Sequence, residues 1–194
     1  MDSETIGFMP ATVWAEMIRT KQLSPVEAMR ALLDRITALE PKVNAFAFLA
    51  EDQAMEAARA AEKALMGGER IGRLHGVPVT IKDLAWTKDM PTQSGSLIFK
   101  DHQPTEDSPV VPRLQAEGAI ILGKTTTSEF GWTGVSHSPL TGISNRGKTG
   151  GTILRSRQVG LDSPTPGQSG TKNIARFRPS VPPEAVGSSP TKTV

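Results

Sequence analysis

A lysine at the end of an apolar stretch is the residue in this chain best placed to do chemistry. Residues 77–81 read Val-Pro-Val-Thr-Ile, and Lys82 and Asp83 follow directly. A stretch that is apolar at nearly every position is typical of a strand buried on both faces. Lys82 would then stand at the mouth of a buried strand, where desolvation can lower the pKa of a lysine until its neutral amine acts as a base. The simpler alternative is a solvated or ion-paired lysine.

The helices around this strand are predicted by hydrophobic periodicity and by helix end signals. We expect helices over residues 10–20, 25–39, 51–66 and 107–117. The second of them begins at a capping box, Ser24-Pro25-Val26-Glu27, in which the serine caps a backbone N–H and proline takes the first helical position. Pro41 is expected to stop that helix.

Strands are expected at three places. Residues 43–49 read as a short extended piece, 77–81 as a buried strand, and 119–122 as a second buried strand, with Gly123-Lys124-Thr125 turning out of it. The order strand, loop, helix, strand from residue 77 onward predicts a mostly parallel sheet with crossover helices. The predicted fold class is therefore α/β.

Composition excludes several kinds of site. The chain has no cysteine, so disulfides and thiolate metal sites are absent, which is compatible with a cytoplasmic protein. Its histidines, His75, His102 and His137, match no metal-ligand spacing. No stretch approaches the roughly 20 apolar residues that cross a membrane, and the polar N-terminus is not a signal peptide. We expect neither a metal nor a membrane partner.

The last quarter of the chain differs from the rest. Among residues 146–194, 25 of 49 are Gly, Pro, Ser or Thr. The same segment has 8 basic side chains and only 2 acidic ones. Residues 1–145 carry 14 basic and 18 acidic side chains. A segment this poor in periodic apolar residues is expected to be disordered. Its basic residues are thinly spread beside a single aromatic, so nucleic acid is not an expected partner.

Several blocks before that tail resemble, in order, the amidase signature family. Residues 76–83, Gly-Val-Pro-Val-Thr-Ile-Lys-Asp, are similar to the block around that family's catalytic lysine. Further similar blocks stand at 92–96, 107–114, 118–125, 128–130 and 140–145. The resemblance implies that residues 1–145 are the N-terminal part of an amidase domain. Its expected fold is a helical N-terminus followed by a mixed, mostly parallel sheet between helices.

The resemblance also implies a chemistry. The family hydrolyses the C–N bond of carboxamides with a Ser-Ser-Lys triad and without a cofactor. The lysine takes a proton through a bridging serine, and the second serine attacks the amide carbon to form an acyl-enzyme. Lys82 matches that lysine, and the expected partner of the full-length form is a small-molecule amide.

The resemblance stops after Asn145, where the family carries both serines in a Gly/Ser-rich segment. This chain continues RGKTGGTILRSRQVG, and no serine matches the context of the nucleophile. A frameshift is the simplest interpretation of so abrupt a change, and a diverged C-terminus is the alternative. We expect a truncated, inactive amidase domain over residues 1–145 and a low-order tail over 146–194.

Two other functions stay open at this point. One is the glutaminase-type subunit of a tRNA-dependent amidotransferase, which would work with partner subunits. The other is a non-catalytic fragment that acts as an interaction module. The sequence identifies neither the amide nor the oligomeric state.

Overall fold

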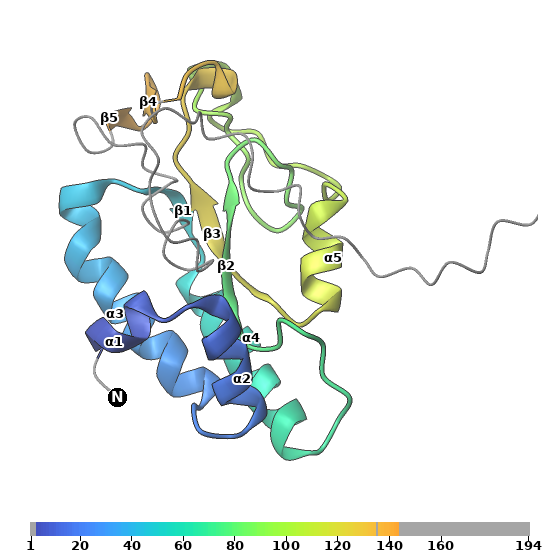
Figure 1. The fold of residues 1–194 in the computed structure, drawn as a ribbon. Coiled ribbons are helices and arrows are strands. Elements are labelled where there is room, and N and C mark those ends of the chain that lie inside the picture. The colour runs from blue at the N-terminus through green and yellow to red at the C-terminus, as the bar shows by residue number, and fades with distance from the viewer. Residues whose placement is uncertain (1–2, 135, 144–194) are drawn as a thin grey trace, which may run out of the picture. The chain divides into compact units, whose positions relative to one another are not determined.

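The computed structural model describes residues 3–134 and 136–143 (Figure 1). Its helices are α1 (Ser3–Phe8), α2 (Ala11–Arg19), α3 (Pro25–Val43), α4 (Glu51–Met66) and α5 (Val110–Ala116). Its strands are β1 (Phe46–Leu49), β2 (Pro78–Lys82), β3 (Ile120–Thr125), β4 (His137–Ser138) and β5 (Gly142–Ile143), and its short 3₁₀ turns are η1 (Leu97–Phe99) and η2 (Glu129–Gly131). The domain boundary predicted after Asn145 and the disorder predicted for 146–194 lie outside the described residues.

Three strands form the central sheet, in the order β1-β3-β2. β2 and β3 run parallel, with Lys82 paired to Thr125, whereas β1 runs antiparallel to β3. β4 and β5 form a separate antiparallel pair. The predicted α/β class and mixed sheet are confirmed.

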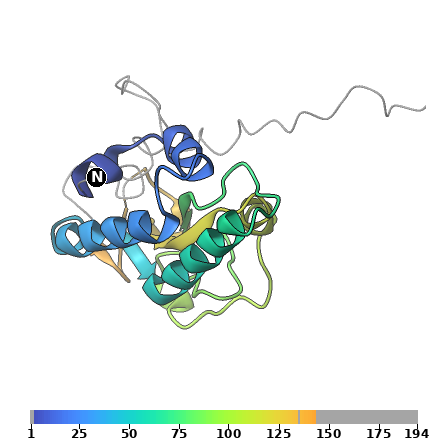
Figure 2. The same ribbon diagram turned by 90° about the horizontal axis from the view of Figure 1, so that it is seen from below.

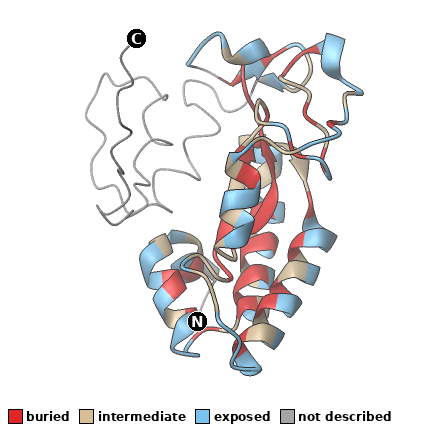
Figure 3. Cartoon of the chain, turned by 90° about the vertical axis from the view of Figure 1, so that its right-hand side faces the viewer, coloured by how far each residue is buried: buried red, intermediate tan, exposed pale blue. Residues whose placement is uncertain are grey.

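Helices cover both faces of this sheet because β3 is apolar on both faces. Ile120 and Leu122 join a core formed with α2, α3 and α4, whereas Ile121 packs on the other side with Val111 of α5. Figure 1 shows α5 on the far side of the strands from α3, and Figure 2 shows α3 and α4 packed together. The buried residues follow the strands and the inner faces of the helices (Figure 3). Within the described residues, no helix combines the length and apolar character needed to cross a bilayer.

Helix α3 begins as predicted but does not end as predicted. The Ser24 hydroxyl accepts a hydrogen bond from the backbone N–H of Glu27 at 3.2 Å, as expected of a capping box. The helix then continues through Pro41 to Val43, so the prediction that Pro41 stops it is wrong. Pro41 lies in the last turn, so the one i→i−4 hydrogen bond that its missing N–H removes is lost only at the end of the helix. The end is set by Asn44, which adopts a left-handed φ of 49°.

Strand β3 is longer than predicted. Gly123, Lys124 and Thr125 do not turn out of the strand but continue it, buried between β1 and β2. A Gly-Lys-Thr sequence favours a turn locally, and hydrogen bonding to a strand on each side overrides that preference. Gly123 has a φ of 149°, and an added Cβ would lie 2.2 Å from the carbonyl oxygen of Phe48 in β1. The close approach of these two backbones therefore requires glycine.

We expect Gly123→Ala to lower the free energy of unfolding by about 3 kcal/mol, because the methyl group would push β1 away from β3. Urea unfolding of the two proteins measures the difference. Gly134→Ala is the matched control, since a Cβ at Gly134 meets nothing within 4 Å. A loss below about 1 kcal/mol at Gly123 would show that the two strands tolerate a side chain there.

Candidate active site

Polar side chains gather where the parallel strands β2 and β3 end. Lys82 is the last residue of β2 and is half-buried. The chain folds back at once, since the backbone N–H of Ala85 donates to the carbonyl of Lys82 at 3.0 Å. Successive side chains in a strand point to opposite faces, so Lys82 lies on the opposite face from Ile81 and from Lys124, the partner of Ile81 in β3.

Lys124 is a second lysine of this edge, and the sequence interpretation missed it. Its side chain has no exposed surface. Its Nζ donates to the carbonyl of Ala85 at 2.5 Å and to the hydroxyl of Thr92 at 2.6 Å, and lies 3.9 Å from Oδ1 of Asp83. Burial lowers the pKa of Lys124 to about 8, although the charges of Asp83 and Asp107 act in the opposite direction. The signal that could have found it is the one used for Lys82, a lysine just after an apolar run.

A lowered pKa often marks a catalytic lysine, but the surroundings of Lys124 do not suit a base. A general base must come within hydrogen-bond reach of the proton that it takes. The amine of Lys124 is enclosed, and oxygens of Ala85, Thr87 and Thr92 surround it within 3.4 Å. Lys82, half-buried at the strand end, is the better candidate for proton transfer.

The carboxylate of Asp83 is also buried, with 1% of its surface exposed. Both of its oxygens accept the backbone N–H of Gln93, at 3.1 and 3.2 Å. The N–H groups of Ser94 and Gly95 donate to it as well. Burial raises the pKa of Asp83, while these amides and the charge of Lys124 oppose the rise.

The loop that Asp83 holds also contacts the segment after β3. Ser94 accepts a backbone hydrogen bond from the N–H of Phe130 at 2.8 Å. The hydroxyl of Ser96 donates to Oε1 of Glu129 at 2.7 Å. Gly95 lies so close to this segment that an added Cβ would be 2.8 Å from the carbonyl oxygen of Thr127. Two blocks that the sequence singled out separately, 92–96 and 128–130, therefore meet at the ends of β2 and β3.

The turn between β4 and β5 carries the start of the last block, 140–145. The hydroxyl of Ser138 accepts the backbone N–H of Thr141 at 3.0 Å. The side-chain amide of Asn44, at the end of α3, donates to the carbonyl of Thr141 at 2.7 Å. Residues 144 and 145 lie outside the described residues. The ordered lead-in to the expected serine segment is thus tied to α3.

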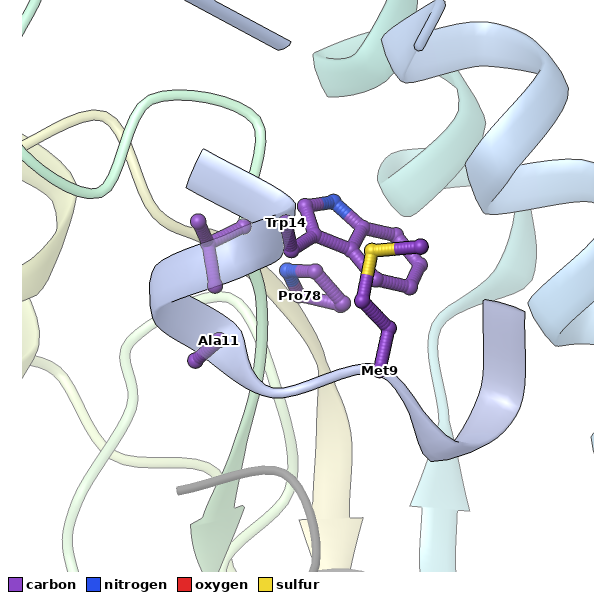
Figure 4. A pocket seen from close by; sticks show the side chains of 5 residues that line it. Met9, Ala11, Trp14 and Pro78 are labelled. Carbon is purple, nitrogen blue, oxygen red and sulfur yellow. The ribbon is translucent and has the colours of Figure 1, made fainter. Parts of the chain in front are cut away.

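A small pocket lies at the other end of β2, lined by Met9, Ala11, Trp14, Val77 and Pro78 (Figure 4). Its volume of about 10 Å³ has room for no more than one water molecule. Pro78 begins β2, whereas Lys82 ends it. This pocket is therefore a packing gap beside Trp14 and not part of the lysine site.

The described histidines and carboxylates form no metal site. Within residues 3–134 and 136–143, no three His, Asp or Glu side chains come together as metal ligands. A ring nitrogen of His75 contacts the carbonyl of Ala61, and one of His102 contacts the carbonyl of Thr92, both at 2.9 Å. These two rings are thus engaged with the backbone.

Comparison with known proteins agrees with this architecture. Residues 27–149 match the family model of the Amidase family, which is more than half of the chain. The chain therefore belongs to the amidase family, and the match ends four residues beyond Asn145.

Individual relatives give the same result. The chain is 41% identical over 134 residues to AmiD of Mycobacterium tuberculosis, a protein assigned as an amidase, covering 69% of this chain and 28% of AmiD. It is 45% identical over 116 residues to one subunit of the glutamyl-tRNA(Gln) amidotransferase of Acidothermus cellulolyticus, covering 60% of this chain and 23% of that one. Among solved structures, a bacterial aryl acylamidase of the amidase signature enzymes matches with a TM-score of 0.66 at 30% identity, over 71% of this chain and 29% of that one. The chain thus spans about a quarter of the length of the relatives it matches.

Proposed function

We propose that this chain is the base-bearing, N-terminal part of a carboxamide hydrolase that works through an acyl-enzyme. The observation that carries the proposal is the position of Lys82, half-buried at the carboxyl end of β2, which runs parallel to the central strand β3. In open α/β sheets, ligands bind outside the carboxyl ends of the strands. Membership of the amidase family supports the same reaction class.

In the proposed reaction, the neutral amine of Lys82 takes the proton of a bridging serine. That serine takes the proton of the nucleophilic serine, whose oxygen attacks the amide carbon. The C–N bond breaks, the amine leaves with a returned proton, and water then hydrolyses the ester. Both serines belong to the segment that the family carries after the position matching Asn145.

We also propose that the 194-residue polypeptide hydrolyses no amide by itself. A base without its nucleophile cannot form the acyl-enzyme, and the members of a triad act as a unit. Incubated with a panel of anilides and primary amides, the purified chain should release product no faster than its Lys82→Ala variant. Turnover that Lys82→Ala abolishes would contradict this proposal and show that the tail supplies a nucleophile.

The similarity to an amidotransferase favours one second candidate, a glutaminase-type subunit. The substrate separates the two candidates. In a chain that carries the serine segment, hydrolysis of glutamine only after the partner subunits are added would favour the glutaminase. Hydrolysis of anilides or simple primary amides without added subunits would favour the amidase.

Exposed apolar side chains beside the site are consistent with either a longer domain or an interaction module. Ile98 of η1 is 81% exposed and Trp132, next to η2, is 89% exposed, and Phe130 is also exposed. Apolar side chains that gather on a surface often mark a contact with another segment or protein.

A cytoplasmic location, proposed from the absence of cysteine, would be checked by cell fractionation.

A further inference from the structure

The described structure contains a buried polar link between the strand that carries Lys82 and the segment that leads toward the expected serines. The link begins at Asp83, the residue after Lys82, whose carboxylate accepts the backbone N–H of Gln93 at 3.1 and 3.2 Å. Ser94 and Gly95 each adopt a left-handed φ, of 53° and 63°. Successive N–H groups in such a conformation form a concave anion-binding nest, and here the anion is a side chain of the same protein.

Lys124 completes the link from the neighbouring strand. It lies 3.9 Å from Asp83, and its Nζ donates to Thr92, where the loop begins, at 2.6 Å. It also donates to the carbonyl of Ala85 in the turn after β2, at 2.5 Å. One buried ammonium group therefore joins the turn that follows Lys82 to the first residue of the loop.

The far side of the loop is fixed to the segment after β3. The backbone carbonyl of Ser94 accepts a hydrogen bond from the N–H of Phe130 at 2.8 Å, and the hydroxyl of Ser96 donates one to Oε1 of Glu129 at 2.7 Å. A Cβ on Gly95 would lie 3.1 Å from Cβ of Ser138 in β4. The β4–β5 turn, which starts the last amidase-like block, thus abuts the loop that Asp83 holds.

We propose that Asp83 and Lys124 are positioning residues that brace the Lys82 strand end against the segment leading to the serines. We call the loop 92–96 the brace, and the buried pair of Asp83 and Lys124 holds it through hydrogen bonds to Gln93 and Thr92. Lys82 itself lies on the opposite face of the sheet, so the pair acts on it through the backbone and not by direct contact. The functional meaning of the brace rests on the proposed role of Lys82, but the brace can be tested without catalysis.

The test is amide hydrogen exchange on the full chain, comparing the wild type with Asp83→Asn. We expect the amides of residues 93–95 to exchange about tenfold faster or more in Asp83→Asn, because they lose a charged acceptor. The amide of Phe130 should also exchange faster, while those of α3 and α4 keep their rates. Asp89→Asn, the same change at an exposed residue six positions along, should alter neither region.

A second readout follows Lys82 directly. The rate at which acetic anhydride labels its amine, measured by mass spectrometry of the peptide that contains it, should change by about threefold or more in Asp83→Asn. The labelling rates of exposed lysines, such as Lys88, should stay the same.

Three results would overturn the proposal. Unchanged amide exchange at residues 93–95 in Asp83→Asn would show that Asp83 does not hold the loop 92–96. Equally faster exchange in α3 and α4 would make Asp83 a determinant of global stability only. Faster amide exchange at residues 93–95 with an unchanged acetylation rate of Lys82 would show that the loop has no effect on Lys82. If Asp83→Asn folds poorly, Ser96→Ala is the second variant. The amides of residues 129–131 should exchange faster in Ser96→Ala, while those of residues 93–95 keep their slow exchange.

Failure of the proposed function would look different. If a chain that carries the serine segment hydrolyses amides equally well with Lys82→Ala, Lys82 is not the base. The exchange and labelling results would then still report whether the brace exists.

Discussion

In a chimera that joins residues 1–145 to the remaining part of AmiD, Lys82→Ala should lower kcat/KM for a carboxamide by about a thousandfold or more. AmiD is a suitable donor because it is 41% identical to this chain over the matched residues. The loss is expected because no other group at the described strand ends is placed to accept the serine proton. The enclosed amine of Lys124, on the opposite face of the sheet, cannot substitute.

Lys82→Arg in the same chimera should be as inactive as Lys82→Ala, because a guanidinium stays protonated at working pH and cannot act as a base. Lys88→Ala is the matched control, since it removes an exposed lysine six residues along the chain and should leave kcat/KM within about twofold. Full activity in Lys82→Arg would mean that the lysine serves only as a positive charge. Equal losses of kcat/KM in Lys82→Ala and Lys88→Ala would contradict the assignment of Lys82 as the base.

The free energy of unfolding should rise with pH between about 8 and 10.5 because of Lys124. Its pKa is about 8 in the folded chain against 10.5 for an ordinary lysine. Between these values the unfolded chain binds more protons than the folded chain, so stability increases as the pH rises. Relative to Lys124→Met, the wild type should gain on the order of 3 kcal/mol across this window.

Urea unfolding at several pH values measures this gain. The window is favourable because the chain has no cysteine and no tyrosine, which leaves lysines and the terminal amine as the groups that titrate there. Lys88→Met should follow the wild type, because Lys88 is exposed. Parallel curves for the wild type and Lys124→Met would contradict a lowered pKa at the buried lysine.

Local patterns in the sequence were sufficient for four of the five described helices and for the Lys82 strand end, but they missed α1 and misplaced the end of α3. The capping box at Ser24 predicts the start of α3, and the Gly67-Gly68 pair predicts the end of α4 at Met66. The apolar run before Lys82 predicts a buried strand with a lysine at its mouth, and the strand includes that lysine as its last residue. These features could be read directly because helix caps, periodicity and apolar runs are properties of neighbouring residues.

Tertiary structure decided the features that depend on distant residues. Gly123-Lys124-Thr125 has the composition of a turn, and only pairing to β1 and β2 makes it a strand. The hydrogen bonds of Asp83 with Gln93, and of Ser96 with Glu129, join residues that no local pattern relates. The family resemblance located Lys82 in the sequence. Whether a lysine is half-buried at a strand end or enclosed beneath it follows from packing, because burial and hydrogen-bond partners come from segments far along the chain.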